Sequence, residues 1–453
     1  MPDAAFSPLL QRLRQRATWL RVLTYALFAF STFSIAGIDT AVILLLGAAL
    51  YHRLRTPVAE PLPRWLVGAF LLLPAAALLA ALANGHEAAW AGPGQPPSVW
   101  HSLGLTVKFY RLALPLALLP ALACVDRRRL LQVLGVSAAL MALYAAVQFH
   151  WGVDWFRPAA RRVVTPFPGV PGVFFAHGNF SEHLTFAGVM LMLAPLFASL
   201  AAAEHGRARA GWGGVALLTA GAVLVSLSRG GWLGLAVGLA FLALDFPLRL
   251  GRSLAALALG VALAWALLGT GWLEARLGGP ERPALVQRLL SSSLAENRER
   301  ILLWQSALLG LRDRPWLGVG YHNYPRYVRP YREAIQQREH TTFQVSIDTH
   351  MHNVYVQVGF ELGGVGLAAY LLWWGAIFRW NRMWLLREEG RFPFERALLR
   401  GASAGLAGIL AAGFFENNFF DSEVQTTIMI LIGLALHAGL QIRRGHEDHP
   451  ALR

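Results

Sequence analysis

Arginine and histidine side chains occur at the ends of apolar stretches in three short motifs. The motifs are residues 226–231 (SLSRGG), 297–304 (NRERILLW) and 348–355 (DTHMHNVY). A guanidinium stays charged and fits phosphate oxygens bidentately, whereas an imidazole titrates near neutral pH and accepts a proton. These residue types predict a site for an anionic ligand beside a general base.

Arg229 lies in a tight turn because apolar stretches flank it on both sides. This position places its side chain near the depth of the lipid headgroups. Two interpretations stay open. Arg229 either snorkels to lipid phosphates, as long cationic side chains often do, or forms a fixed phosphate-binding group.

Arg300 and Trp304 are four residues apart, so they share one face of the helix that the apolar spacing predicts over 297–311. Arg298 lies on the same segment. The face could point Arg300 toward the membrane, with Trp304 as an interfacial anchor. It could equally be a solvated face on which Glu296 and Arg300 pair.

His350 and His352 precede an apolar stretch that begins with Asn353 and Tyr355. A histidine at this place could cap a helix or act as a general base. Asp348 with the two histidines could also bind a metal. Because no cysteine or second carboxylate cluster joins them, we expect no metal and no cofactor.

The composition excludes a soluble enzyme, a fibrous protein and a disordered chain. Of the 453 residues, 55% are hydrophobic and only 15% are charged, and the mean hydropathy is +0.44. Lys108 is the only lysine, so the formal charge of +14 comes from arginines that cluster between apolar stretches. This pattern is typical of a membrane protein that follows the positive-inside rule, and it argues against a nucleic-acid partner.

An all-α integral membrane protein with about twelve transmembrane helices is therefore predicted. The expected spans are residues 18–35, 38–51, 65–84, 103–123, 129–149, 184–203, 212–227, 230–246, 252–270, 353–378, 398–415 and 424–442. Arginine-bearing loops then lie on the inside, the outer segments 36–37 and 85–101 carry no Lys or Arg, and both termini are expected in the cytoplasm; long loops are not bound by this rule. The short outer loop 416–423 carries Glu416 and Asp421 instead of arginine.

Three parts of the chain follow from these spans. Residues 1–270 would hold helices one to nine, and 353–453 would hold the last three and a cytoplasmic tail. Between them, 271–352 would form a long outer loop that is helical and covers the site as a lid. A further outer loop spans about 150–183.

The order of the motifs resembles a known superfamily. S-x-S-R-G at Arg229 is followed by R-x-x-x-W at Arg300, by P-x-x-G-V-G at 315–320, by H-N-x-Y at His352 and by E-x-G-x-x-G at 361–366. This order is similar to that of the bacterial O-antigen ligases, O-antigen polymerases and protein O-oligosaccharyltransferases. The resemblance covers roughly residues 170–440.

The resemblance implies a multi-span C-type glycosyltransferase fold in the bacterial inner membrane, with its active site facing the periplasm. A ligase of this family moves O-antigen polysaccharide from undecaprenyl diphosphate to a sugar hydroxyl of lipid A–core oligosaccharide, without a metal. By position, Arg229 and Arg300 match the family's functional arginines, and His352 matches its essential histidine.

These residue types suit that reaction. Two permanently charged guanidiniums can neutralise the diphosphate leaving group, and His352 can take the proton of the attacking hydroxyl. A single base with a good leaving group predicts direct displacement with inversion at the anomeric carbon. The carboxylic acid that hydrolytic glycosidases use is unnecessary, because a diphosphate leaves without one.

Other residues are candidates for binding substrate. Lys108 and Arg111 lie one turn apart inside the expected span 103–123, where charges are costly and often functional. They could reach the diphosphate from within the membrane, or they could snorkel outward. The remaining substrate-binding candidates are Arg161, Arg298, His350, Asn353 and Tyr355, and residues 177–183 are a candidate wall of the site.

Two other functions stay open. An O-antigen polymerase or protein O-oligosaccharyltransferase would carry the same motifs, although many of the latter have extra soluble sequence after the last span. A lipid or glycan transporter would place functional residues near the membrane midplane and on both faces. Here the charged motifs gather on one predicted outer face, which favours an enzyme at the interface.

Overall fold

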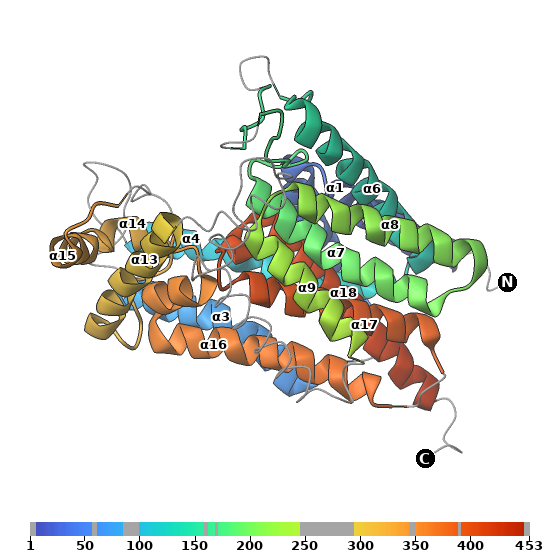
Figure 1. Ribbon diagram of the computed structural model, residues 1–453. Helices are drawn as coiled ribbons and strands as arrows, with labels where there is room; N and C mark the ends of the chain where they lie inside the picture. Colours follow the sequence, from blue (N-terminus) through green and yellow to red (C-terminus); the bar gives the residue numbers. More distant parts are fainter. Residues whose placement is uncertain are drawn as a thin grey trace.

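The protein is a bundle of helices in this computed structural model (Figure 1). The structure describes residues 6–56, 61–84, 99–157, 162–167, 171–244, 294–343, 350–387 and 391–447. Over these residues the only β-pairing consists of two isolated bridges, Val153 with Val163 and Pro166 with Phe174. The all-α prediction is therefore confirmed for the described part of the chain.

The described helices follow one another along the chain. Their bounds are α1 Phe6–Phe30, α2 Ile35–Arg55, α3 Arg64–Ala83, α4 Val99–Thr106, α5 Leu114–Leu122, α6 Arg127–Trp151, α7 His183–Ala203, α8 Gly206–Val225, α9 Arg229–Ala243, α13 Leu294–Asp313, α14 Tyr324–Tyr327, α15 Arg329–Glu339, α16 Val354–Leu385, α17 Pro393–Ala412 and α18 Ser422–Glu447. Two 3₁₀ segments, Val107–Ala113 and Asn418–Phe420, join α4 to α5 and precede α18.

The chain is a multi-pass membrane protein. Among the described residues, eight helical segments are long and apolar enough to cross a bilayer, and Thr18–Phe30 and α9 are shorter apolar helices. Every expected span coincides with a helix except 252–270, which lies outside the described residues. The count of twelve and the three-part division stay predictions.

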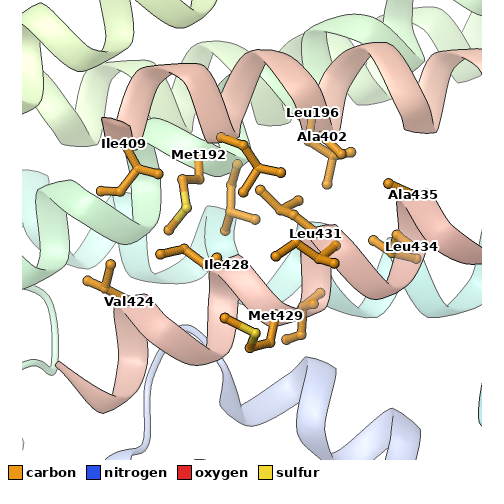
Figure 2. Packing of buried hydrophobic residues seen from close by; sticks show 14 of the residues in the cluster. Met192, Leu196, Ala402, Ile409, Val424, Ile428, Met429, Leu431, Leu434 and Ala435 are labelled. Carbon is orange, nitrogen blue, oxygen red and sulfur yellow. The ribbon is translucent and has the colours of Figure 1, made fainter. Parts of the chain in front are cut away.

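The centre of the bundle is formed by α7, α9, α17 and α18 (Figure 1). Figure 2 shows Met192 and Leu196 of α7 packed with Ile409 of α17 and with Ile428 and Leu431 of α18. Lipid is as apolar as these side chains, so helix association in a membrane depends on close packing rather than on the hydrophobic effect.

Glycines on α17 permit this close packing. A Cβ added to Gly408 would lie 2.6 Å from the carbonyl oxygen of Gly234 in α9, and one on Gly234 would lie 2.7 Å from that of Gly408. On another side of α17, a Cβ on Gly405 would lie 2.5 Å from the carbonyl oxygen of Met192. Only glycine lets α17 approach α7 and α9 at these points.

Loops of the described part of the chain lie at the two ends of the bundle. At one end, Arg127 pairs with Glu395 at 3.1 Å and Arg128 pairs with Glu204 at 2.7 Å. At the same end the last turn of α18 lies against residue 392, and Arg21 in the second half of α1 donates to the carbonyl oxygen of Cys124. Among the described residues, the arginine-bearing loops before α6 and before α17 therefore share one end with the end of α18.

The other end holds the three motifs together with the turn between α1 and α2 and the loop between α6 and α7. Asn179 donates to the carbonyl oxygen of Phe33 at 2.7 Å, and Thr185 donates to Asp421 at 2.7 Å. The predicted outer helical region is partly described, and α13 to α15 lie together at this end (at the left in Figure 1). A helix over 297–311 is confirmed as part of α13, whereas α15 was not expected from the spacing.

Helix α16 is broken at Gly363, although the sequence predicts one uninterrupted span over 353–378. Gly363 has a φ of 66° and a ψ of −168°, outside the helical region. The rings of Tyr355 and Tyr370 lie 6.0 Å apart, whereas fifteen residues of straight helix would span roughly 22 Å. The segment that follows His352 therefore folds back along the rest of α16.

The break exposes backbone groups, and the glycine-rich turn after α13 satisfies them. Two amides of that turn donate to the carbonyl oxygens of residues 360 and 361, and the amides of residues 364 and 365 donate to carbonyl oxygens of the turn. The four bonds are Val319 to Phe360 at 3.1 Å, Gly320 to Glu361 at 2.8 Å, Gly364 to Pro315 at 2.7 Å and Val365 to Trp316 at 3.1 Å. Broken helices in membranes require such pairing, because lipid offers no hydrogen bonds. The P-x-x-G-V-G and E-x-G-x-x-G motifs are thus one structural unit.

Candidate active site

Three turns position the candidate catalytic residues at one end of the bundle. In the turn before α9, the Ser228 hydroxyl accepts a hydrogen bond from the amide of Gly231 at 3.0 Å and starts the helix. Asn353 starts α16 in the same manner, because its side chain accepts from the amides of Tyr355 and Val356. Both capping residues are of the types preferred at this position. The third turn follows α17 and carries Glu416.

Glu416 lies at the centre of the cluster and is buried. Its Oε1 lies 3.8 Å from Nη2 of Arg300, and its Oε2 lies 3.8 Å from Nδ1 of His352. Nη1 of Arg300 donates to the carbonyl oxygen of Phe415 at 2.5 Å. One carboxylate thus faces the predicted base on one side and a predicted diphosphate-binding arginine on the other.

The turn that carries Arg229 packs directly against this carboxylate. A Cβ on Gly230 would lie 3.1 Å from Cγ and 3.3 Å from Oε1 of Glu416. The glycine after Arg229 is therefore what allows α9 to begin beside Glu416. The structure brings all three predicted catalytic positions, Arg229, Arg300 and His352, to one carboxylate.

The backbone of His352 is held in an unusual conformation. Its φ is 48°, in the left-handed region that few residues other than glycine adopt. Its amide donates to Nδ1 of His350 at 3.1 Å, and the two imidazole rings lie 4.4 Å apart. Such strain persists only where neighbouring contacts impose it, and it is common at functional sites.

Contacts on either side of His352 impose this conformation. Nε1 of Trp304 donates to the carbonyl oxygen of Met351 at 2.9 Å, and the amide of Met351 donates to Gln357 at 3.0 Å. The expected shared face of Arg300 and Trp304 is confirmed. Trp304, however, fixes the loop before α16 rather than acting only as an interfacial anchor.

The charges of the cluster favour an ionised Glu416 and a neutral His350. Burial alone raises the pKa of Glu416, but Arg300, His352 and His350 together hold that pKa below its ordinary value. Burial, and after it the neighbouring His352, lower the pKa of His350 to about 4. Because Nδ1 of His350 accepts a hydrogen bond, the neutral ring carries its proton on Nε2.

The possible metal set is described only in part. Asp348 lies outside the described residues, and Nδ1 of His350 already accepts a backbone hydrogen bond. Over the residues that the structure describes, no three His, Cys, Asp or Glu side chains gather as a metal site would require.

Asn353 and Tyr355 are engaged within the protein. The side-chain amide of Asn353 donates to the carbonyl oxygen of Phe414 at 3.1 Å, and the Tyr355 hydroxyl donates to that of Leu410 at 2.8 Å. Both bonds tie the start of α16 to the end of α17, next to Glu416. These two residues therefore position His352, and contact with substrate stays a prediction for them.

Lys108 and Arg111 lie in the 3₁₀ segment that interrupts the expected fourth span. Nη2 of Arg111 donates to Asp39 of α2 at 2.5 Å, and its guanidinium lies over the ring of Tyr110 at 4.8 Å. Arg111 is buried, so this pairing offsets the cost of its charge in the membrane. Lys108 is exposed and lies within electrostatic reach of Glu361.

Arg298, Arg161 and the candidate wall of the site remain to be placed in the fold. Arg298 is exposed on α13, and its spacing of two from Arg300 puts it on a different face. Arg161 lies outside the described residues. Residues 177–183, by contrast, join the α6–α7 loop to the start of α7, where Nδ1 of His183 lies 2.9 Å from the carbonyl oxygen of Ser226.

Two carboxylates of the site region had no assigned role in the sequence analysis. Glu416 was noted only as an acidic residue in a short outer loop, and Asp39 was not singled out. One sequence feature could have drawn attention to Glu416: it directly follows an apolar span, in a loop without arginine. That signal does not specify which distant side chains the glutamate meets.

Residues 214–371 match the family model described as O-antigen ligase. The matched range includes Arg229, Arg300 and His352 and ends before Glu416. A search of curated proteins finds no match to the chain. Over residues 214–371, this multi-pass membrane protein is therefore similar to the O-antigen ligase family.

Proposed function

We propose that the protein is an O-antigen ligase of the bacterial inner membrane. It transfers O-antigen polysaccharide from undecaprenyl diphosphate to a sugar hydroxyl of lipid A–core oligosaccharide, at the periplasmic end of the bundle. One observation carries the proposal: Arg300 and His352 flank the two oxygens of buried Glu416, directly beside the turn of Arg229.

His352 is the general base. Its Nδ1 faces Glu416, so a proton on Nδ1 is directed at the carboxylate and Nε2 is left to accept the proton of the acceptor hydroxyl. The separation of 3.8 Å exceeds a hydrogen bond, and catalytic contacts of this kind often shorten when substrate binds. Glu416 thus positions the imidazole and stabilises the imidazolium that forms, as the carboxylate of a catalytic triad does.

The transfer is a single displacement. The acceptor oxygen forms a bond to the anomeric carbon while the bond from that carbon to the diphosphate oxygen breaks. The hydroxyl proton moves to His352, and the electron pair of the broken bond leaves with undecaprenyl diphosphate. Because attack and departure occur on opposite sides of the carbon, the anomeric configuration inverts.

Arg229 and Arg300 stabilise the leaving group. The negative charge on the diphosphate increases as the sugar departs, and a guanidinium offers several N–H donors at fixed geometry. Glu416 and the carbonyl oxygen of Phe415 hold Arg300 in place before substrate arrives. Groups that are already oriented toward developing charge contribute most to this kind of catalysis.

Complementation of a strain that lacks its own ligase tests the proposal. Wild type should restore the O-antigen ladder of lipopolysaccharide, whereas His352→Ala, Arg229→Ala and Arg300→Ala should not, and Glu416→Gln should restore a weaker ladder. Arg128→Ala is the matched control, because Arg128 lies at the opposite end of the bundle in an ion pair with Glu204. Membrane levels of each variant are measured alongside.

Different results point to different functions. If wild type changes only the chain length of O-antigen on its lipid carrier, the protein is a polymerase and the ligase proposal fails. If glycan appears on protein instead of lipid A–core, the proposed acceptor is wrong and the protein is a protein O-oligosaccharyltransferase. A full ladder from His352→Ala at normal expression contradicts the general base.

A further inference from the structure

A second polar site lies in the loop between α6 and α7, and it shares no side chain with the Glu416 cluster. The loop encloses a cavity of about 450 Å³, which is within the range of small-molecule sites of roughly 300–1,000 Å³. Its lining includes Asp154, Arg157, Thr165, His177 and Glu182, with the ring of Phe175. The mechanism proposed above uses none of these side chains.

The walls of this cavity are firmly built. The amide of Asp154 donates to the carbonyl oxygen of Arg162 at 2.7 Å, and the amide of Phe175 donates to that of Thr165 at 2.9 Å. Gln148 of α6 links the far wall, because it accepts from the amide of His177 at 3.1 Å and donates to the carbonyl oxygen of Gly178 at 2.8 Å. The cavity therefore exists before any ligand binds.

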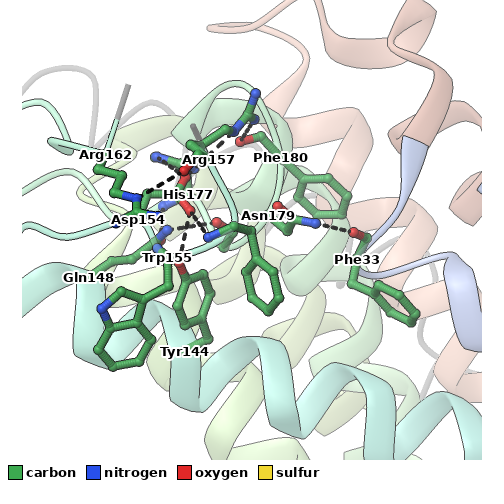
Figure 3. Close-up of polar contacts among 12 residues, drawn as sticks. Phe33, Tyr144, Gln148, Asp154, Trp155, Arg157, Arg162, His177, Asn179 and Phe180 are labelled. Atoms are coloured by element: carbon green, nitrogen blue, oxygen red, sulfur yellow. Dashed lines mark hydrogen bonds and ion pairs between the residues drawn. The ribbon is translucent and has the colours of Figure 1, made fainter. Parts of the chain in front are cut away.

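The buried carboxylate of Asp154 lines the cavity, and Figure 3 shows its polar contacts. Oδ1 of Asp154 accepts from the Tyr144 hydroxyl at 2.8 Å and from the amide of Phe156 at 3.0 Å. Its Oδ2 lies 3.5 Å from Nε of Arg157 and 3.7 Å from Nε2 of His177. Within the described part of the chain, Oδ2 makes no hydrogen bond, although only 1% of the side chain is exposed. A buried acceptor in this state favours a ligand that donates to it.

The charges of the lining select against an anion. Asp154 and Glu182 both contribute carboxylates, and Asp154 already neutralises Arg157. A phosphate group would be repelled by the carboxylates, whereas hydroxyl groups could donate to them and accept from the imidazole and guanidinium. Phe175 adds an apolar face. This mixture of donors and acceptors beside an aromatic ring suits a sugar.

The cavity is joined to the candidate active site through the first turn of α7. His183 lines the cavity, and its Nδ1 lies 2.9 Å from the carbonyl oxygen of Ser226 in the turn that carries Arg229. Thr185, two residues further on, donates to Asp421 in the loop that follows Glu416. A ligand in the cavity would therefore lie beside the turns of the active site.

We propose that this cavity is a saccharide subsite, which holds a sugar unit next to the turn of Arg229. The identity of the ligand as substrate rests on the proposed glycan transfer. Sugar hydroxyls could come from the core oligosaccharide of the acceptor or from the polysaccharide of the donor, and the experiment below separates the two.

Two cavity variants and two matched controls test the subsite. Ser181→Trp fills the cavity from its exposed rim, and Glu182→Gln removes one carboxylate. Glu182 precedes α7, but its side chain makes no capping hydrogen bond, so the helix should still form. Gln337→Trp and Glu333→Gln make the same changes on the exposed surface of α15.

The measurement is direct binding to the purified full-length protein in lipid nanodiscs, by calorimetry and saturation-transfer NMR. The probes are core oligosaccharide released from lipid A and O-polysaccharide released from its carrier. One probe should bind wild type and both controls, and its affinity should fall at least tenfold in both cavity variants. Binding of the core probe assigns an acceptor subsite, and binding of the polysaccharide assigns a donor subsite.

Three results would overturn the subsite. They are the absence of binding of either probe to wild type, equal affinity in wild type and both cavity variants, and displacement of the bound probe by excess inorganic phosphate. The assay involves no turnover, so its outcome is separate from complementation. If complementation succeeds and the cavity variants bind normally, only the subsite fails. If the cavity variants lose binding but wild type restores no ladder, the subsite stands and the transfer proposal fails.

Discussion

The protein contains two buried carboxylates that each face one arginine and one histidine, and they are built differently. Asp154 faces Arg157 and His177, and Glu416 faces Arg300 and His352. Oδ1 of Asp154 accepts two hydrogen bonds from its own loop and from α6. The Glu416 contacts come instead from α13 and from the loop before α16, and its Oε2 makes no hydrogen bond within the described residues.

This difference separates a group that holds a loop together from a group that prepares a reaction. Asp154 is fixed by neighbours that lie close to it in sequence, so its bonds stabilise the local fold. Glu416 holds an arginine and a strained histidine that three separate segments deliver, at distances that leave room for movement. Removing the Asp154 charge should therefore affect stability most, and removing the Glu416 charge should affect transfer most.

The largest expected effect follows from replacing the base. His352→Ala should lower the rate of glycan transfer by about 10²–10⁴-fold, which is the usual contribution of general base catalysis. The thermal unfolding temperature should change little, because the ring is partly exposed and its Nδ1 makes no hydrogen bond within the described residues. Transfer is measured with purified lipid-linked donor and lipid A–core acceptor.

His340→Asn is the control for this test. His340 is exposed at the end of α15 with a φ of 47°, a conformation that asparagine tolerates. This variant should retain full activity. If His340→Asn loses as much transfer as His352→Ala, the loss reports general damage to the outer end rather than a missing base.

A smaller effect is expected from Glu416→Gln. The amide keeps the size of the side chain but removes the charge that orients His352 and holds Arg300, so kcat should fall about 10- to 10²-fold. The KM for each substrate should change less, since Glu416 acts through its neighbours. Steady-state kinetics in both substrates measure the two parameters. A rise in KM at unchanged kcat would place Glu416 in substrate binding and remove the contrast with Asp154.

The reverse pattern is expected for Asp154→Asn. Loss of the carboxylate weakens the bonds from Tyr144 and Phe156, at a cost of about 1–3 kcal/mol for disturbed buried hydrogen bonds. The unfolding temperature should fall, while kcat falls less than in Glu416→Gln. Thermal unfolding in detergent and the transfer assay are run on the same preparations. If Asp154→Asn is as stable as wild type, the proposed structural role of this cluster is wrong.

The sequence predicts the parts of the site that depend on local patterns. Apolar runs and arginine-bearing loops predict the helices and their alternation, and a spacing of four predicts the shared face of Arg300 and Trp304. The three motif residues of the resemblance, Arg229, Arg300 and His352, do meet in the structure. All of these features follow from short-range periodicity, charge or motif order.

The remaining features depend on how helices pack, which short-range patterns do not encode. Glu416 becomes central only because the turn after α17 lies beside α9 and α13. The reversal at Gly363 depends on backbone groups of the turn after α13, some fifty residues earlier by the spacing of the two motifs. The cavity at Asp154 likewise depends on isolated bridges between short loop segments that show no strand pattern.

The smallest effect concerns the dependence of stability on pH. The pKa of His350 is about 4 in the folded protein because burial disfavours its charged form, against roughly 6.5 in the unfolded chain. Between these values the unfolded chain binds a proton that the folded protein does not. Unfolding free energy should therefore fall as pH drops from about 6.5 to about 4, with a slope of at most about 1.4 kcal/mol per pH unit from this group.

Replacing His350 tests this dependence and sharpens the comparison of the two clusters. His350→Asn should flatten the decline of unfolding temperature between pH 6.5 and 4, and His340→Asn should leave it as in wild type. Below that range both should still lose stability, because the pKa of Glu416 is held down in the fold and protonation removes its attraction to Arg300. An unchanged decline in His350→Asn would mean that acid sensitivity arises elsewhere, with His177 the first group to test, since burial lowers the pKa of His177 as well.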